Sequence, residues 1–162
     1  YKGHEVAVHT LTHPNLTGEE KETIIYQVEE DKKQLEKLVG YEIHGMAYPC
    51  GGVNNDDRVA EIIKENTKIK YVRTITSSHS FDVPKNFHRL NPSVYIAETD
   101  KMFELAKEFI SLKTDESQIF YVWGHAYEFD LLEQIPWEKF EEFCKFLNVN
   151  ENQHCRKTSC YF

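Results

Sequence analysis

The chain has 162 residues and a net charge of −8 at pH 7, with 40% apolar and 28% charged residues. This length is enough for one domain with a buried core, and the negative charge argues against nucleic acid or an anionic membrane surface as the partner. No run approaches the roughly 20 apolar residues that cross a bilayer, and no signal peptide is visible, which favours a cytoplasmic location. Because the first residue is Tyr1, we expect the chain to be part of a longer polypeptide.

The four cysteines, at positions 50, 144, 155 and 160, form neither a C-x-x-C pair nor a regular disulfide spacing, which favours a reducing compartment. Residues 148–162 are polar and unpatterned. His154 lies beside Cys155 and Cys160 there, but zinc sites usually need four well-spaced ligands, so a loosely ordered tail is favoured. We therefore divide the chain into a domain over residues 1–147 and a tail over residues 148–162.

The first predicted element is a short strand over residues 4–9, because apolar and polar residues alternate there with Val6 and Val8 on one face. His9 and His13 follow where the strand becomes a loop that stops at Pro14. Sites in α/β sheets are built at the carboxyl ends of strands. The two histidines are therefore candidate functional residues.

Helices and strands then alternate. A helix is predicted from a capping box of Thr17 and Glu20 to a stop at Gly40. Its apolar face holds Ile24, Ile25, Val28, Leu35 and Leu38. A strand over residues 42–49, a helix over residues 56–66 and a strand over residues 70–76 follow. That helix directs Val59, Ile62 and Ile63 inward.

In the second half, residues 77–93 lack periodicity and contain two prolines, which predicts a long loop of the kind that often carries function. A helix over residues 100–112 offers Phe103, Ala106 and Ile110 to a core. Residues 118–125 are nearly all apolar, as in a strand buried on both faces, and Pro136 opens a last helix. Alternating strands and helices predict a parallel sheet, either open or closed into a barrel.

Three groups of residues at predicted strand ends can carry chemistry. They are His9 with His13, the sequence YPCGG over residues 48–52, and His125 with Glu128 and Asp130. Each has an ordinary alternative: histidines spaced by chance, a Pro–Gly turn, and a buried hydrogen-bonded histidine. Two imidazoles suit zinc but need a third ligand, often a carboxylate. Gly124 favours a site at His125, because glycine permits close backbone approach.

The same residues carry a resemblance to a known family. GHEVAVHTLTHPNL resembles the H-[ST]-x-x-H metal-binding motif of the polysaccharide deacetylases, carbohydrate esterase family 4. MAYPCGGVN resembles that family's third motif, which forms one wall of the active-site groove, and FYVWGHAYEFD is similar to the segment with its late catalytic histidine. The order agrees over nearly the whole chain, to about residue 146.

The resemblance implies a distorted (β/α) barrel that hydrolyses N- or O-acetyl groups with one divalent metal, zinc or else cobalt, nickel or manganese. It implies that His9 and His13 hold the metal with an aspartate, and that His125 protonates the leaving amine or alkoxide. The amide after Pro49 then helps to stabilise the oxyanion. The implied partner is an acetylated carbohydrate or a small N-acetylated substrate, and the expected substrate-binding residues are Tyr48, Pro49, Cys50, Arg89 and Glu128.

The chain also departs from the family. A strand ending in T-F-D-D, which supplies the metal-binding and base aspartates, does not occur in this sequence. Ala47 stands where an arginine is usual and Cys50 where an aromatic residue is common, and Arg89 is the candidate replacement for the arginine. We expect a barrel that is incomplete at the N-terminus and also at the C-terminus, with unpaired strand edges through which copies of the chain can pair.

Three functions follow from the sequence. The first is a metal-dependent deacetylase. The second is a non-catalytic remnant that keeps the fold and only binds a metal or ligand. The third is an unrelated α/β binding module in which all three groups are turns.

Overall fold

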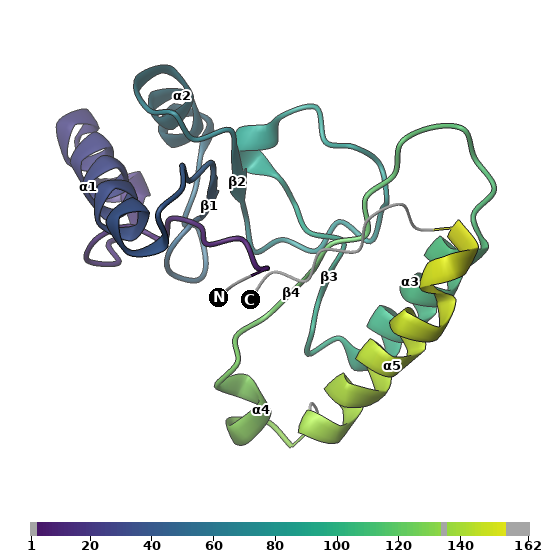
Figure 1. Cartoon of the computed structure of the whole chain (residues 1–162). Helices are drawn as coiled ribbons and strands as arrows, with labels where there is room; N and C mark the ends of the chain where they lie inside the picture. Colours follow the sequence, from purple (N-terminus) through teal and green to yellow (C-terminus); the bar gives the residue numbers. More distant parts are fainter. Residues whose placement is uncertain (1–2, 134–135, 155–162) are drawn as a thin grey trace. The chain divides into compact units, whose positions relative to one another are not determined.

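The computed structural model describes residues 3–133 and 136–154. The chain divides into two compact units, one formed by residues 1–75 and 84–91 and the other by residues 76–83 and 92–162. Each unit has its own pair of parallel strands, its own helices and its own hydrophobic core (Figure 1). The predicted division at residue 147 stays a prediction.

Four extended segments lie parallel to one another in the first unit. β1 (Gly45–Ala47) pairs with β2 (Tyr71–Arg73), with Gly45 opposite Tyr71. A single bridge from Val8 to Met46 adds one segment beside β1, and a bridge from Leu90 to Arg73 adds another beside β2. The predicted strands over residues 42–49 and 70–76 are therefore present but shorter.

The strand predicted over residues 4–9 is reduced to the bridge at Val8. The reason lies in side chains that take the backbone groups on either side. Tyr41 accepts the Val6 N–H at 3.2 Å and donates to the His4 carbonyl, and Asp31 accepts the His9 N–H at 2.9 Å. Only Val8 makes ladder hydrogen bonds here, through its N–H to Gly45 and its carbonyl from Ala47, both at 2.9 Å.

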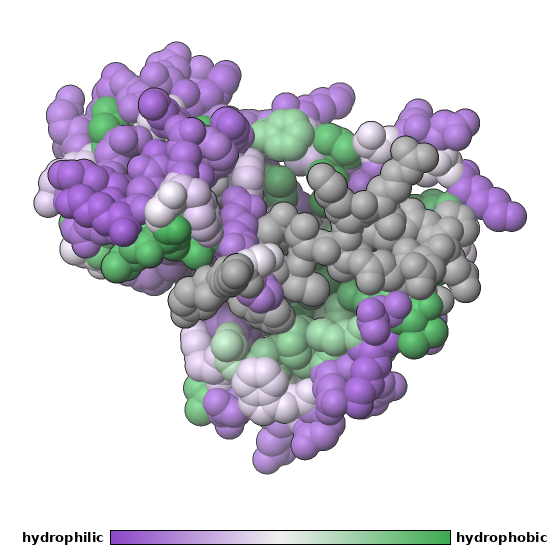
Figure 2. Space-filling view, viewed as in Figure 1, coloured by the Kyte–Doolittle hydropathy of each residue, from purple (hydrophilic) through white to green (hydrophobic). Residues whose placement is uncertain are grey.

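Two α-helices contact each other in the first unit, α1 (Lys21–Val39) and α2 (Asp57–Asn66). The visible outer surfaces of both are predominantly hydrophilic (Figure 2), as expected for helices with one buried face. The predicted capping box is wrong, because Thr17 lies in a separate 3-10 turn, η1 (Leu16–Gly18), and its hydroxyl donates to Asn15. The predicted stop is confirmed: Gly40 has φ 79° and donates its N–H to the Glu36 carbonyl at 2.9 Å.

The start of α2 follows from Asp56, whose carboxylate accepts the Val59 N–H at 2.7 Å. Val59 and Ile63 are fully buried, as predicted, and Ile62 packs against the same core. On α1, Ile24 and Val28 are buried, whereas Leu38 is 81% exposed and its predicted place in the core is wrong. The buried core of this unit consists of Val8, Leu16, Ile24, Val28, Ile43, Met46, Tyr48, Val59, Ile63, Ile69 and Val72.

The second unit contains β3 (Val94–Tyr95) and β4 (Val122–Trp123), which are parallel. Its helices are α3 (Thr99–Ser111), the short α4 (Glu128–Leu131) and α5 (Trp137–His154). Both residues of β4 are half-buried, so the predicted burial on both faces is wrong. Within the part of the chain that the structure describes, β4 pairs with β3 alone.

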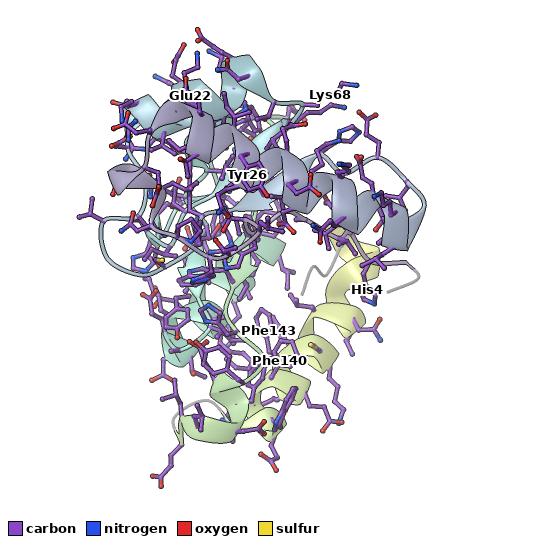
Figure 3. All side chains as sticks on the ribbon, turned by 90° about the vertical axis from the view of Figure 1, so that its left-hand side faces the viewer. His4, Glu22, Tyr26, Lys68, Phe140 and Phe143 are labelled. Atoms are coloured by element: carbon purple, nitrogen blue, oxygen red, sulfur yellow. The ribbon has the colours of Figure 1, made fainter. Side chains whose placement is uncertain are left out.

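Helices α3 and α5 contact each other through aromatic side chains. The rings of Phe103 of α3 and Phe143 of α5 lie 5.4 Å apart and edge to face. Phe129 of α4 also packs on α5, with its ring 4.8 Å from that of Phe140. Figure 3 shows Phe140 and Phe143 on the inner side of α5. Helix α5 extends beyond residue 147 to His154, so the start of the predicted tail is helical. Cys155 and Cys160 lie outside the described residues.

The predicted long loop over residues 77–93 is confirmed as largely irregular chain with one 3-10 turn, η2 (Phe87–Arg89). The structure is thus a mixed α/β protein with short parallel strands, as predicted. No closed barrel is present among residues 3–133 and 136–154. The described helices include none that is long and apolar enough to cross a membrane.

Candidate functional site

His9 lies directly after the Val8 bridge, where the sheet ends and the loop begins. Its Nδ1 is 2.9 Å from the carbonyl oxygen of Ala47, the last residue of β1. Because a carbonyl only accepts, Nδ1 carries the proton and Nε2 is the basic nitrogen. Histidines that bind metal ions have this arrangement, in which a backbone carbonyl or carboxylate orients the ring.

His13 lies close to His9, with ring centroids 4.9 Å apart and an interplanar angle of 71°. The loop between them is strained, since Thr10 has φ 70° and His13 has φ 60°. It is held by Gln27 of α1, whose side chain accepts the Thr12 N–H and donates to the Thr12 hydroxyl. The structure therefore brings together the two histidines that the sequence pairs.

The third group near this pair is the thiol of Cys50, whose Sγ is 3.7 Å from His13 Nδ1 and 3.5 Å from the His13 carbonyl oxygen. The two imidazoles suit a zinc-type ion. However, residues 3–133 and 136–154 contain no group of three His, Cys, Asp or Glu side chains that could hold a metal ion. The donor set thus fits the implied metal in part and lacks a third ligand.

The turn after β1 is built mainly for packing. Tyr48 is 1% exposed, and its hydroxyl donates to the His88 carbonyl at 2.7 Å. Burial raises the pKa of this phenol. Asn54 is buried and donates to the carbonyls of Pro49 and Cys50 at 3.0 and 2.8 Å, which fixes the turn. The side chain of Tyr48 is thus fixed by burial and by this hydrogen bond, and the part that Tyr48, Pro49 and Cys50 take in substrate binding stays a prediction.

Arg89, the candidate replacement for the missing arginine, is directed to the start of α2. Its Nε donates to Asn55 at 2.9 Å and its Nη1 lies 2.7 Å from Asp57. The part that Arg89 takes in substrate binding stays a prediction.

In the second unit, His125 and Glu128 form a hydrogen-bonded pair just beyond β4. His125 Nδ1 is 3.0 Å from Glu128 Oε1, and the His125 backbone N–H donates to Glu128 Oε2 at 2.9 Å. The His125 side chain is 41% exposed and that of Glu128 only 9%. The carboxylate thus orients a half-exposed imidazole from below the surface.

Glu128 receives a further hydrogen bond from the Tyr95 hydroxyl. Burial raises the pKa of the Glu128 carboxyl, but the hydrogen bonds from Tyr95 and from the His125 backbone and ring outweigh it and lower the pKa below its ordinary value. Glu128 is therefore ionised at neutral pH. Burial and the bond to Glu128 raise the pKa of Tyr95.

A glycine is required at position 124, because the backbone there lies close to the side chain of Ile96. A Cβ at this position would lie 2.3 Å from Cγ2 of the buried Ile96. The sequence-based expectation that Gly124 permits a close contact is therefore confirmed.

The sequence-based assignment of Glu128 to substrate binding stays a prediction, and its carboxylate is largely buried against His125. Sequence reasoning missed Tyr95, because a lone tyrosine at a strand end has no distinctive spacing. The one available signal for Glu128 was its position three residues after His125, which suits a turn of helix. Asp130, the other nearby acid, accepts a hydrogen bond from Trp137 Nε1 at 2.8 Å. His125 belongs to the second unit and His9 and His13 to the first, so their predicted meeting at one rim stays a prediction.

Two adjacent histidines in the loop after a parallel strand form the candidate site of the first unit. Residues 1–71 match the family model for polysaccharide deacetylase, so this part of the chain is similar to that family. The match includes His9, His13 and the turn at residues 48–52, and it ends before His125. No curated protein and no solved structure gives a significant match to the chain.

Proposed function

We propose that this chain carries part of the active site of a metal-dependent hydrolase that removes acetyl groups from an acetylated carbohydrate. The observation that carries the proposal is the Glu128–His125 pair at the end of β4. The family match of residues 1–71 supports the reaction class. The distorted (β/α) barrel of the family is the fold that we propose.

His125 is the proposed general acid. With its Nδ1–H bound to Glu128, Nε2 is the nitrogen that takes up and releases a proton. The imidazolium donates this proton to the leaving amine or alkoxide, and the neighbouring carboxylate stabilises the charged ring. Glu128 therefore acts through His125 as a positioning residue. The backbone at Cys50 is the proposed donor to the oxyanion.

His9 and His13 are the proposed ligands of one divalent metal ion, zinc or else cobalt, nickel or manganese. When bound, such an ion polarises the acetyl carbonyl and lowers the pKa of a bound water. The support in this chain is the hydrogen bond between Nδ1 of His9 and the Ala47 carbonyl, which orients the His9 ring, together with the adjacent ring of His13.

A binding protein without catalysis is the second candidate. One observation favours it: the described residues offer no carboxylate as a third member of the His9–His13 group. Such a remnant would retain metal or ligand binding with no acetyl hydrolysis.

Two measurements on the purified chain separate these functions. The first is zinc binding by calorimetry for the wild type, His9→Ala and His13→Ala, with His44→Ala as the control, since His44 lies before β1 with Glu42 as its acidic neighbour. We expect zinc binding to be lost only in the first two variants. The second is acetate release from penta-N-acetylchitopentaose with added zinc or cobalt. Zinc binding, with acetate release only after a preceding strand that ends in two aspartates is added, supports the first proposal. Zinc binding without release from either version favours the second candidate, and the absence of both contradicts both proposals.

A further inference from the structure

The second unit contains another histidine paired with a carboxylate. His79 Nε2 lies 2.7 Å from Glu98 Oε2. His79 comes from the irregular segment of residues 76–83, and Glu98 directly precedes α3. The side chain of His79 is 42% exposed, close to the value for His125.

Glu98 is held in place by several donors. Its Oε1 accepts the hydroxyl of Ser77 and the Tyr95 N–H, the latter at 3.2 Å. Burial raises the pKa of Glu98, but the hydrogen bonds from Ser77 and His79 outweigh it and hold the pKa below its ordinary value. The group is thus a fixed carboxylate that orients the ring of His79, as Glu128 orients the ring of His125.

The backbone at His79 supports the same arrangement. His79 has φ 49°, a left-handed conformation that is uncommon for residues other than glycine. Its N–H donates to the Ser93 carbonyl at 2.9 Å, and the Ser78 N–H donates to the Pro92 carbonyl at 2.8 Å. Strained residues of this kind persist where the surroundings fix them, and they cluster at functional sites.

Tyr95 joins the two histidine–carboxylate pairs. Its backbone N–H donates to Glu98 and its hydroxyl donates to Glu128. Tyr95 is the last residue of β3, and His125 follows shortly after the parallel strand β4. The two histidine–carboxylate pairs therefore lie at the carboxyl end of β3 and β4. Parallel α/β structures bind ligands at this end of their strands.

We propose that His79 is a second substrate-contacting residue of the site that contains His125, with a hydroxyl or amide group of an acetylated carbohydrate as its ligand. This inference rests on the proposed function. Because Glu98 takes the Nε2–H, Nδ1 is the acceptor of the neutral ring, and no partner for Nδ1 is found among the described residues. The imidazoles of His79 and His125, at the carboxyl end of the same two strands, can then bind successive polar groups of one saccharide chain.

The test is a titration of the ¹⁵N-labelled chain with penta-N-acetylchitopentaose, followed by the imidazole resonances of each histidine. We expect shifts at His79 and His125 and none at His44, a control histidine that also has an acidic neighbour but precedes β1. Shifts at His125 without His79 would overturn the inference and leave the proposed function standing. Shifts at neither histidine would overturn both.

Variants give a second readout. His79→Asn keeps a residue that tolerates the left-handed backbone, and Glu98→Gln keeps the size of the side chain while it removes the charge. We expect each to weaken saccharide binding by about threefold to tenfold, which corresponds to one hydrogen bond. His44→Gln should bind as the wild type does. Unchanged binding in His79→Asn, with an unchanged circular dichroism spectrum, would contradict the inference.

Discussion

His125 and Glu128 are joined twice, because one carboxylate accepts both the ring Nδ1–H and the backbone N–H of the histidine. The ring bond sets the tautomer, and the backbone bond fixes where the chain turns after β4. Helix α4 begins at Glu128 itself, so this short helix places the carboxylate under the imidazole. The geometry of the His125–Glu128 pair is therefore set by the backbone conformation between β4 and α4.

The substitution Glu128→Gln should allow the His125 ring to adopt both neutral tautomers. The carboxylate accepts three donors, from Tyr95 and from the ring and backbone of His125, whereas an amide offers one oxygen and two donors of its own. At least one buried donor then loses its partner, at a cost of about 1–3 kcal/mol. We expect the ¹⁵N shifts of His125 to move toward a mixture of the two neutral tautomers. Shifts equal to those of the wild type would show that Glu128 does not position the ring.

The pKa of Glu128 and that of Glu98 give stability a defined dependence on pH. Both carboxyls have a pKa below the ordinary 4.5 in the folded protein. Their stabilisation is therefore fully present above pH 4.5 and is lost as the pH falls through the lower folded values.

We expect the free energy of unfolding, measured with urea, to decrease from about pH 5 to pH 3. The decrease should be smaller in the double variant Glu128→Gln, Glu98→Gln. Glu104→Gln is the matched control, because this residue forms only an exposed ion pair with Lys101. An equal decrease in the double variant and the control would contradict the assignment.

Gly124→Ala should destabilise the second unit. The new methyl group would lie 2.3 Å from Ile96 Cγ2 and 3.0 Å from Ile96 Cβ, which forces the buried isoleucine to move. Overpacking of this kind costs about 1–3 kcal/mol. Gly51→Ala is the control, since nothing lies within 4 Å of its added Cβ and its change should be within about 0.5 kcal/mol. Thermal unfolding measures both, and equal midpoints would contradict the packing at Gly124.

Asp56→Ala should weaken α2. It removes the side chain that accepts the Val59 N–H at 2.7 Å, and loss of such a cap costs about 1 kcal/mol. The neighbouring Asp57→Ala removes only an ion pair with Arg89, in which the Asp57 side chain is 88% exposed, and should cost less. A larger effect of Asp57→Ala in urea unfolding would show that the ion pair outweighs the cap.

The sequence predicted the end of a helix correctly where a single residue determines that end. Asp56 at the start of α2 and Gly40 at the end of α1 are examples, because a cap and a left-handed glycine act within one turn. The capping box at Thr17 failed because a 3-10 turn comes between it and the helix. The strand over residues 4–9 failed because Tyr41 and Asp31, both distant in sequence, bind its backbone groups.

The features of the candidate site were likewise predictable only where the signal is local in the sequence. Spacing alone suggested that His9 and His13 act together, and their rings are adjacent. The burial of Tyr48 and Glu128 was not predictable from spacing, since it depends on partners such as His88 and Tyr95. The pair of His79 and Glu98 joins a residue of the irregular loop to the residue directly before α3, 19 positions later, and no local pattern indicates it.

The last prediction is that residues 1–162 alone release acetate at or near the background rate. A hydrolytic water needs a base, and general-base catalysis contributes typically 10²–10⁴-fold. Among the described residues no third acidic or other ligand joins His9 and His13, and Glu128 is already bound to His125 and Tyr95. A version extended by a preceding strand that ends in two aspartates should release acetate from penta-N-acetylchitopentaose, and His125→Ala should reduce that rate by about 10²–10⁴-fold.

Robust release from residues 1–162 that is lost in His13→Ala would contradict the prediction, since another carboxylate would then serve as the base. Asp82, whose side chain accepts a hydrogen bond from Ser80 at 2.9 Å in the irregular segment, would be the next residue to replace.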